Sequence, residues 1–145
     1  MKILSNEQII KESTDRQLVR SSERQSDLGE VFTPSELVIE ILEQLPDENW
    51  EDGKTFLDPT CGNGQFLAAV AIVKMSLNHT NVLNSIYGVD IMQDNVAECR
   101  ERLIAIAGDT LANRKIVENN IRCEDGLAYG YTFGTSPFET LFGEL

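Results

Sequence analysis

The order of hydrophobic and polar positions along the chain predicts helices that alternate with short buried strands. A first helix is expected from a capping box at Ser5 to about Gln25, with few apolar positions. Thr33 as the N-cap and Pro34 as the first helical residue predict the start of a second helix. Its apolar stripe recurs at helical spacing and comprises Leu37, Val38, Ile41, Leu42 and Leu45.

Short apolar runs further along the chain indicate three buried strands: residues 55–57, residues 85–91 and a segment that ends near residue 124. Helices are expected from residue 66 to about 78, and over a stripe that ends at Gly108. The segment around Arg114 and Lys115 lacks a regular pattern and predicts an irregular connection. Strands that alternate with helices favour an α/β fold with a parallel sheet, flanking helices and N-terminal helices before it.

The amino-acid composition indicates the class of protein. A chain of 145 residues with 41% hydrophobic and 25% charged side chains is ordinary for one soluble globular domain. No stretch reaches the roughly 18 uninterrupted apolar residues of a membrane span, and the N-terminus lacks a secretory core. Cys61, Cys99 and Cys123 are widely spaced, which favours reduced thiols in a cytoplasm and predicts no metal site.

The charge distribution argues against DNA binding by the whole surface of the domain. The net charge is −12, whereas DNA binding depends on neutralising phosphates. Residues 1–26 hold five basic and four acidic side chains, so DNA contact by this chain would come mainly from this arm. Arg16, Arg20 and Arg24 line up on one helical face. A solvated charged face is the simpler interpretation of this stripe, and a partner is the other route to DNA.

The most informative segment is the string Asp-Pro-Thr-Cys-Gly-Asn-Gly-Gln-Phe-Leu at residues 58–67, between a strand and a helix. Its glycines allow a tight turn and close approach of a ligand to the backbone, and the helix N-terminus adds unpaired N–H groups. Asp58 would repel a phosphate but suits an ammonium group. The segment therefore predicts a site for an amino-acid-like nucleoside.

This string resembles the first motif of the N6-adenine-specific DNA methyltransferases, whose ligand is S-adenosylmethionine. The resemblance implies cofactor contacts at Asp58, Pro59, Cys61, Gly62, Gly64 and Phe66. It also implies a partial Rossmann-like methyltransferase fold. A generic strand-to-helix turn is the alternative, but such a turn requires neither the acid nor the Pro-x-Cys sequence.

Val-Phe-Thr-Pro at residues 31–34 resembles the tenth motif of the same family, which packs against the methionine part of the cofactor. The resemblance implies contacts at Phe32, Thr33 and Pro34. Its place before the first motif matches the gamma-type order of type I and type IIG modification enzymes. Helix capping alone also explains Thr33 and Pro34, so this alternative stays open.

Two further strand ends carry acids. Asp90 ends the second strand, where an acid accepts hydrogen bonds from ribose hydroxyls, and Ile91 could cover one adenine face. Helix capping by Asp90 is the alternative, and both roles can coexist. Asp125, Gly126 and Leu127 resemble the third motif, which implies that Asp125 takes the adenine amino group and Leu127 lies beside the ring. Asp-Gly alone is simply a turn.

The resemblance stops at the fourth motif, Asn-Pro-Pro-Tyr, which carries methyl transfer in the family and is absent from this sequence. The nearest string is Ser136, Pro137 and Phe138, for which a turn is the favoured interpretation. A three-stranded parallel sheet would leave its first strand as an open edge, so a partner, a second copy or the aromatic tail is expected to cover it.

These inferences divide the chain into a helical arm (1–28), a cofactor-binding domain (29–128) and an aromatic tail (129–145). We predict the N-terminal, cofactor-binding part of an adenine-specific DNA methyltransferase that needs a partner or a missing region for catalysis. An inactive regulatory or protein-interaction module is the main alternative. Methylation of RNA, protein or a small molecule is disfavoured by the first motif, and a dehydrogenase by Asp58 and the absence of Gly-x-Gly-x-x-Gly.

Overall fold

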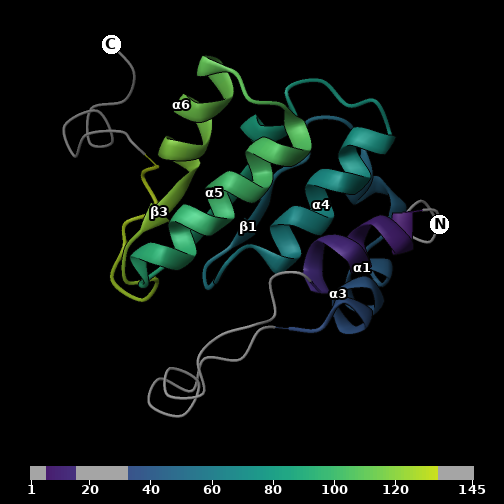
Figure 1. Cartoon of the computed structure of the whole chain (residues 1–145), viewed down its shortest axis with the longest axis horizontal. Coiled ribbons are helices and arrows are strands. Elements are labelled where there is room, and N and C mark those ends of the chain that lie inside the picture. Colours follow the sequence, from purple (N-terminus) through teal and green to yellow (C-terminus); the bar gives the residue numbers. More distant parts are fainter. Residues whose placement is uncertain (1–5, 16–32, 134–145) are drawn as a thin grey trace.

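The computed structural model describes residues 6–15 and 33–133 (Figure 1). The elements in chain order are α1 (Glu7–Asp15), α3 (Ser35–Glu43), the 3-10 helix η2 (Asp47–Trp50), β1 (Phe56–Asp58), α4 (Gln65–Ser76), the 3-10 helix η3 (Val82–Ser85), β2 (Ile86–Asp90), α5 (Gln93–Ala107), α6 (Leu111–Asn120) and β3 (Ile121–Cys123). The predicted α/β fold is confirmed. The predicted continuation of the first helix to Gln25 lies outside the described residues.

The three described strands form one parallel sheet in the order β1-β2-β3. The register places Leu57 of β1 beside Tyr87 of β2, so these side chains share one face of the sheet. Ile86 and Gly88 point to the opposite face, where a Cβ on Gly88 would lie 2.6 Å from the Leu67 side chain of α4. The described helices therefore pack on one face. Among the described strands β1 forms an edge, as the sequence predicted.

Helix α4 is the centre of the hydrophobic core. It contacts α1, α3 and α5 as well as β1 and β2, and nearly every side chain from Gln65 to Lys74 is buried. A helix surrounded in this way has no solvent face, which explains its run of apolar residues without amphipathic spacing. Ile10 of α1 and Val38 of α3 are fully buried against this core. None of the helices in residues 6–15 and 33–133 has the length and apolar character needed to cross a bilayer.

The start of α3 differs from the prediction. Pro34, not Thr33, is the N-cap, and the first helical residue is Ser35. Pro34 has an extended ψ of 152°, and its carbonyl accepts hydrogen bonds from the N–H groups of Leu37 and Val38. No side chain caps this helix. The predicted Thr33 cap was wrong because the helix begins one residue later than the Thr-Pro pattern indicated.

The buried face of α3 also differs from the predicted stripe. Val38, Ile39 and Leu42 are buried, whereas Leu37 and Ile41 are exposed. Residues four apart lie on the same side of a helix, so Leu37 and Ile41 form an apolar strip that faces outward. The true core stripe lies one residue away and includes Ile39, which the sequence interpretation left out.

The segment predicted to be irregular, around Arg114 and Lys115, forms helix α6. Its N-cap is Thr110, whose hydroxyl accepts a hydrogen bond of 3.0 Å from the Asn113 N–H. Val117 is its only buried residue, so the helix lacks the apolar stripe by which it could have been recognised. The prediction that the preceding helix ends at Gly108 is confirmed.

The second face of the sheet carries the described part of the aromatic tail. The ring of Phe133 packs edge-on against Tyr87, with 4.8 Å between the ring centroids. Leu57 nevertheless stays 51% exposed. A groove of about 600 Å³ lies over this face, lined by Thr55, Leu57, Tyr87, Asn120, Tyr131, Thr132 and Phe133. Residues 129–133 thus cover part of the second face.

Candidate functional site

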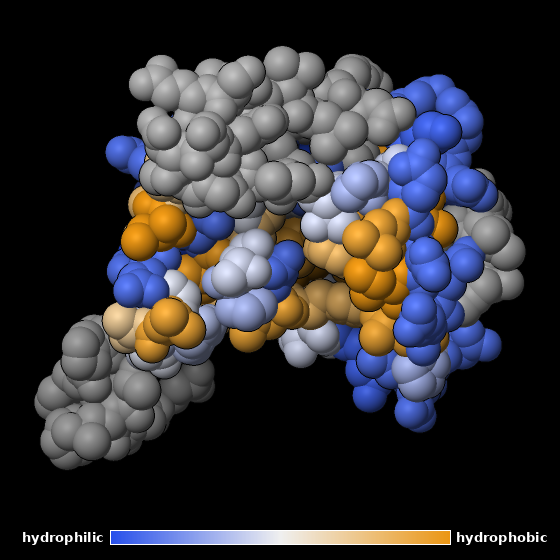
Figure 2. Space-filling view, turned by 90° about the horizontal axis from the view of Figure 1, so that it is seen from below, coloured by the Kyte–Doolittle hydropathy of each residue, from blue (hydrophilic) through white to orange (hydrophobic). Residues whose placement is uncertain are grey.

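The carboxyl ends of the parallel strands gather the predicted motifs at one edge of the sheet. The Cys61 N–H donates to the Val89 carbonyl at 2.9 Å, and the Glu124 N–H donates to the Asp90 carbonyl at 3.0 Å. A Cβ on Gly126 would lie only 2.5 Å from the Pro59 carbonyl oxygen, so the loops after β1 and β3 touch. This edge lies on the underside of the molecule, where α4 and α5 begin and where hydrophobic patches are exposed between hydrophilic ones (Figure 2).

The carboxylate of Asp90 organises the two loops beside it. Its Oδ1 accepts the Gly62 N–H at 3.1 Å, and its Oδ2 accepts the Met92 N–H at 3.0 Å and the Asn95 amide at 3.2 Å. Asp90 therefore fixes the start of α5 as well as the glycine turn. Because a carboxylate offers about four acceptor positions, one remains on Oδ1 for a ligand hydroxyl.

Asp58 is half-buried at the end of β1. Burial raises the pKa of this carboxyl group, and the nearby charge of Asp90 acts in the same direction. A hydrogen bond of 3.0 Å from the Thr60 N–H opposes the rise. A cationic group placed beside Asp58 would lower its pKa again, so the site favours a ligand that carries an ammonium group.

Backbone conformation and packing also explain the residue types in the glycine turn. Gly62 and Gly64 have φ angles of +54° and +93°, which favour glycine. A Cβ on Gly64 would also lie 2.7 Å from the Cys99 sulfur. Cys61 is buried, with its sulfur 3.0 Å from where a Gly88 Cβ would stand. A hydrogen bond with Cys99 and burial raise the pKa of the Cys61 thiol, so its side chain is an inert packing group.

Two large apolar side chains are exposed beside the carboxylates. Ile91 is 67% exposed directly after β2, and Leu127 is fully exposed after β3. The Leu127 N–H donates to Asp125 at 3.0 Å in a tight turn, and the Tyr131 hydroxyl donates to the Gly126 carbonyl at 2.6 Å. The loop after β3 is therefore held in shape, and the Asp125 carboxylate stays at the surface.

The Thr-Pro segment lies next to the glycine turn. The side-chain amide of Gln65 donates to the Thr33 carbonyl at 3.0 Å, and Pro34 is exposed beside it. Phe66 lies in the first turn of α4. It lines a groove of about 250 Å³ along the open edge of β1, together with Leu42, Phe56, Leu57, Asp58, Leu67 and Val70.

Some predicted residues lie outside the described parts of the chain. They are Phe32 of the tenth-motif segment, the stripe of Arg16, Arg20 and Arg24, and the catalytic candidates Ser136, Pro137 and Phe138, the string nearest to the fourth motif.

Sequence reasoning missed a buried polar network behind the glycine turn. Arg102 of α5 is only 7% exposed and donates to the Asn63 carbonyl at 3.1 Å and to Gln65 Oε1 at 2.7 Å. Asn63 is fully buried and donates to Glu98 at 2.7 Å. The sequence signal was Arg102 itself, which directly precedes Leu103 on the apolar face of a predicted helix.

The electrostatics of this edge are acidic. Asp58, Asp90 and Asp125 lie around the glycine turn, and no lysine or arginine of the described residues forms an ion pair with them. Carboxylates arranged in this way suit amine and hydroxyl donors and disfavour phosphate. The exposed apolar residues Ile91 and Leu127 suit the faces of a flat heterocycle. The edge therefore fits a nucleoside that bears an amino group.

Comparison with known proteins agrees with this chemistry. Residues 17–129 match the N-6 DNA methylase family. The chain is also 33% identical over 103 residues to the type II methyltransferase M.VspI of Vibrio sp. (strain 343). That match covers 71% of this chain but 22% of the relative, so the chain spans only part of the relative's length. No solved structure matches. The family resemblance is confirmed, and the chain belongs to the N-6 DNA methylase family.

Proposed function

We propose that this chain supplies the S-adenosylmethionine-binding part of an adenine-specific DNA methyltransferase, which methylates N6 of adenine. The observation that carries the proposal is the meeting of three carboxylates with the glycine turn at the carboxyl edge of the sheet. Asp58, Asp90 and Asp125 provide the acceptors, and Ile91 and Leu127 provide exposed apolar contacts. Members of the family use this cofactor.

The acceptor set fits the polar groups of the cofactor one by one. Asp58 would take the ammonium group, Asp90 the ribose hydroxyls and Asp125 the exocyclic amine of adenine. Ile91 and Leu127 would contact the two faces of the ring. When bound, S-adenosylmethionine supplies an electrophilic methyl group on a sulfonium. The chain's own residues would hold and orient it for in-line transfer, a contribution of positioning and electrostatics.

The base-binding half would come from elsewhere. A target adenine must leave the duplex before its amino group can be reached, and the Asn-Pro-Pro-Tyr motif that receives it in the family is absent from this sequence. We therefore infer that a partner, or sequence beyond this segment, completes the catalytic site. DNA would be bound by that partner or through Arg16, Arg20 and Arg24.

The second face of the sheet supports the need for such a partner. Leu57 is exposed, β1 is an unpaired edge among the described strands, and an open groove lies beside Tyr87. An apolar, unpaired edge favours association. A protein partner or a second copy would complete the sheet, in a cytoplasmic setting that keeps the three free cysteines reduced.

A second candidate function is a catalytically inactive regulatory module that binds the cofactor or a methyltransferase subunit. The missing fourth motif favours it, and the net charge of −12 suits protein contact better than DNA contact. Incubating the chain with unmethylated DNA and cofactor labelled in the methyl group tests the second candidate; an absence of label fits both candidates, because the first one also places the base-binding half outside this chain. Label on adenine N6 would exclude the inactive module.

Calorimetric titration with S-adenosylhomocysteine tests the cofactor assignment. We expect saturable binding by the wild type and about tenfold weaker binding by Ile91→Ala and by Leu127→Ala. Leu111→Ala is the matched control because Leu111 is also apolar and 82% exposed, but lies on α6. Equal affinity in all four proteins, or no binding by the wild type, would contradict the proposal.

A further inference from the structure

We propose that Arg102 is a positioning residue that holds the glycine turn in its binding shape and ties it to α1 and to the start of α3. The inference rests on the proposed function, because it takes this turn to be the cofactor site. Arg102 lies on α5, behind the turn, and does not itself belong to the edge where the three carboxylates meet.

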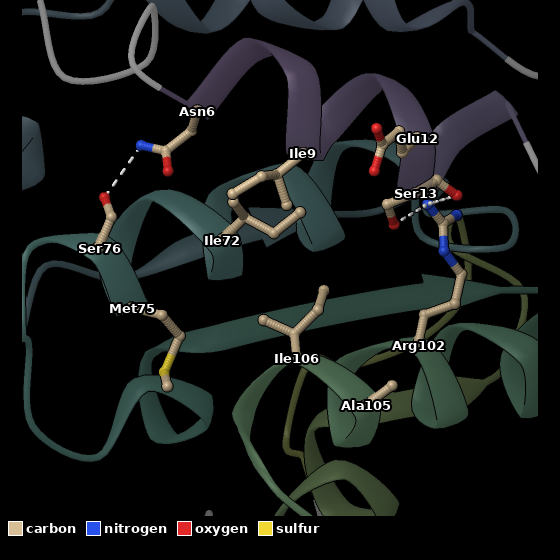
Figure 3. Close-up of a pocket in the computed structure, with 10 residues that line it drawn as sticks. All are labelled: Asn6, Ile9, Glu12, Ser13, Ile72, Met75, Ser76, Arg102, Ala105 and Ile106. Atoms are coloured by element: carbon tan, nitrogen blue, oxygen red, sulfur yellow. Dashed lines mark hydrogen bonds between the residues drawn. The ribbon is translucent and has the colours of Figure 1, made fainter.

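The guanidinium of Arg102 divides its donors between two directions. Nη1 donates to the Asn63 carbonyl at 3.1 Å and to Gln65 Oε1 at 2.7 Å, which are on either side of Gly64. Nη2 donates to the Ser13 carbonyl at 3.4 Å and to the Ser13 hydroxyl at 3.3 Å (Figure 3). One side chain therefore joins the glycine turn to the end of α1.

The network continues beyond the partners of Arg102. The side-chain amide of Gln65 donates to the Thr33 carbonyl at 3.0 Å, and Thr33 directly precedes Pro34, the N-cap of α3. Asn63 donates in turn to Glu98 on α5 at 2.7 Å. The turn is thus fixed on its buried side by three segments that are far apart in the sequence: α1, the residues before α3, and α5.

The Arg102 bonds to Ser13 cross a gap between helices. Helix α1 packs mainly on α3 and α4, and a groove of about 590 Å³ separates it from α5 (Figure 3). Arg102 lies at one end of this groove, and Ile9, Met75 and Ile106 line its apolar part. The guanidinium is therefore a polar link between α1 and α5 where direct packing is sparse.

The energetic cost of burying the Arg102 charge favours a positioning role over a simple contribution to stability. Arg102 is buried without an ion pair among the described residues, and its Nε has no hydrogen-bond partner among them. Burial lowers the pKa of this group, which reflects the cost of placing a charge there. A well-packed apolar side chain often stabilises such a position as well or better. What the arginine adds is a rigid fork of donors that fixes the geometry of the turn.

Amide hydrogen exchange of the ligand-free chain provides the first test. We expect Arg102→Met to speed exchange in residues 62–66, with partial recovery in Arg102→Lys, which keeps the charge but not the fork. Arg100→Met is the control, because Arg100 lies on the same helix but donates to the carbonyls of Ile121 and Glu118. Unchanged exchange in the turn of Arg102→Met would overturn the inference, whether or not the cofactor binds.

Binding provides the second test and separates the two proposals. We expect S-adenosylhomocysteine to bind Arg102→Met about tenfold more weakly than the wild type, with an intermediate affinity for Arg102→Lys. Arg100→Met should lose stability while it keeps wild-type affinity. Equal weakening by Arg100→Met would mean that only general stability matters and would overturn the inference.

Absent binding by the wild type would refute the proposed function, while the exchange result still decides the role of Arg102. If Arg102→Met does not fold, Gln65→Leu replaces it and should give the same two effects.

Discussion

The backbone N–H of Gly62 donates a hydrogen bond of 3.1 Å to the carboxylate of Asp90, so the turn after β1 is tied to the end of β2. The two residues lie 28 positions apart. Their contact joins the two parts of the edge that we assign to the methionine and ribose portions of the cofactor. The shape of the turn and the position of the carboxylate therefore depend on each other.

Asp90→Asn should weaken both stability and ligand binding. An amide offers one oxygen and one NH2 group, so either Gly62 or the pair Met92 and Asn95 would face a donor instead of an acceptor. We expect a loss of about 1–3 kcal/mol in the free energy of unfolding, measured by urea denaturation. Affinity for S-adenosylhomocysteine should fall as well. Asp47→Asn, at an exposed acid outside this edge, is the control and should change neither quantity.

Gly64→Ala should be more destabilising than a change at a glycine of similar backbone shape. Gly53 has a φ of +87° with open space around it, so Gly53→Ala should cost only the backbone strain, about 1 kcal/mol. Gly64→Ala adds the clash with Cys99, and we expect roughly 2–4 kcal/mol in total. Urea denaturation measures both changes.

A double-mutant cycle identifies the cause of the Gly64 effect. Cys99→Ala removes the sulfur that a Cβ at position 64 would meet, so the Gly64→Ala change should cost less in that background. Strictly additive losses would show that the clash with Cys99 is not the reason for this glycine.

The raised pKa of Asp58 predicts two opposite effects of pH. The folded chain binds this proton more tightly than the unfolded chain, so stability due to Asp58 should fall as pH rises from its ordinary pKa of 3.8 through the raised value. Ligand affinity should rise over the same window, because an ammonium group favours the ionised carboxylate. Titrations at several pH values, compared between wild type and Asp58→Asn, measure both effects. Identical pH profiles in the two proteins would refute the role given to Asp58.

Lys74 should contribute a pH dependence of stability at alkaline pH. It is fully buried on α4, donates to the Lys54 carbonyl and the Ser85 hydroxyl, and lies 5.0 Å from the centre of the Phe56 ring. Burial lowers its pKa from 10.5, so the unfolded chain binds this proton more tightly than the folded chain. The stability of the wild type relative to Lys74→Met should therefore rise as pH increases toward 10.5. Parallel stability curves for the two proteins would contradict this.

Local patterns predicted the parts of the fold that depend on local chemistry. The glycine turn, the acid at the end of β2 and the end of α5 at Gly108 were all predicted correctly in kind and place. Helix α6 was missed because Val117 is its only buried residue, so no apolar stripe marks it. The buried face of α3 was misassigned because Leu37 and Ile41 share its apolar character, and only packing on α1 and α4 decides which side is covered.

In the candidate site, too, features set by local sequence were predicted and features set by packing were not. The sequence predicted which residues follow each strand, and parallel pairing then brings Asp58, Asp90 and Asp125 to one edge. It did not predict why Gly64 lacks a side chain, because Cys99 comes from a helix 35 residues away. The Arg102 network was also hidden, since its partners Ser13 and Gln65 are far apart in the sequence and are brought together by the packing of α1 on α4.

The most direct test of the central claim is an NMR titration of the isotope-labelled chain with S-adenosylhomocysteine. The account predicts shifts of the amide signals of Gly62, Ile91 and Leu127 that saturate together. Signals of Ile9 and Met75, which line the groove between α1 and α5, should move little. An absence of shifts, or shifts confined to that groove, would contradict the assignment of the cofactor to the carboxyl edge of the sheet.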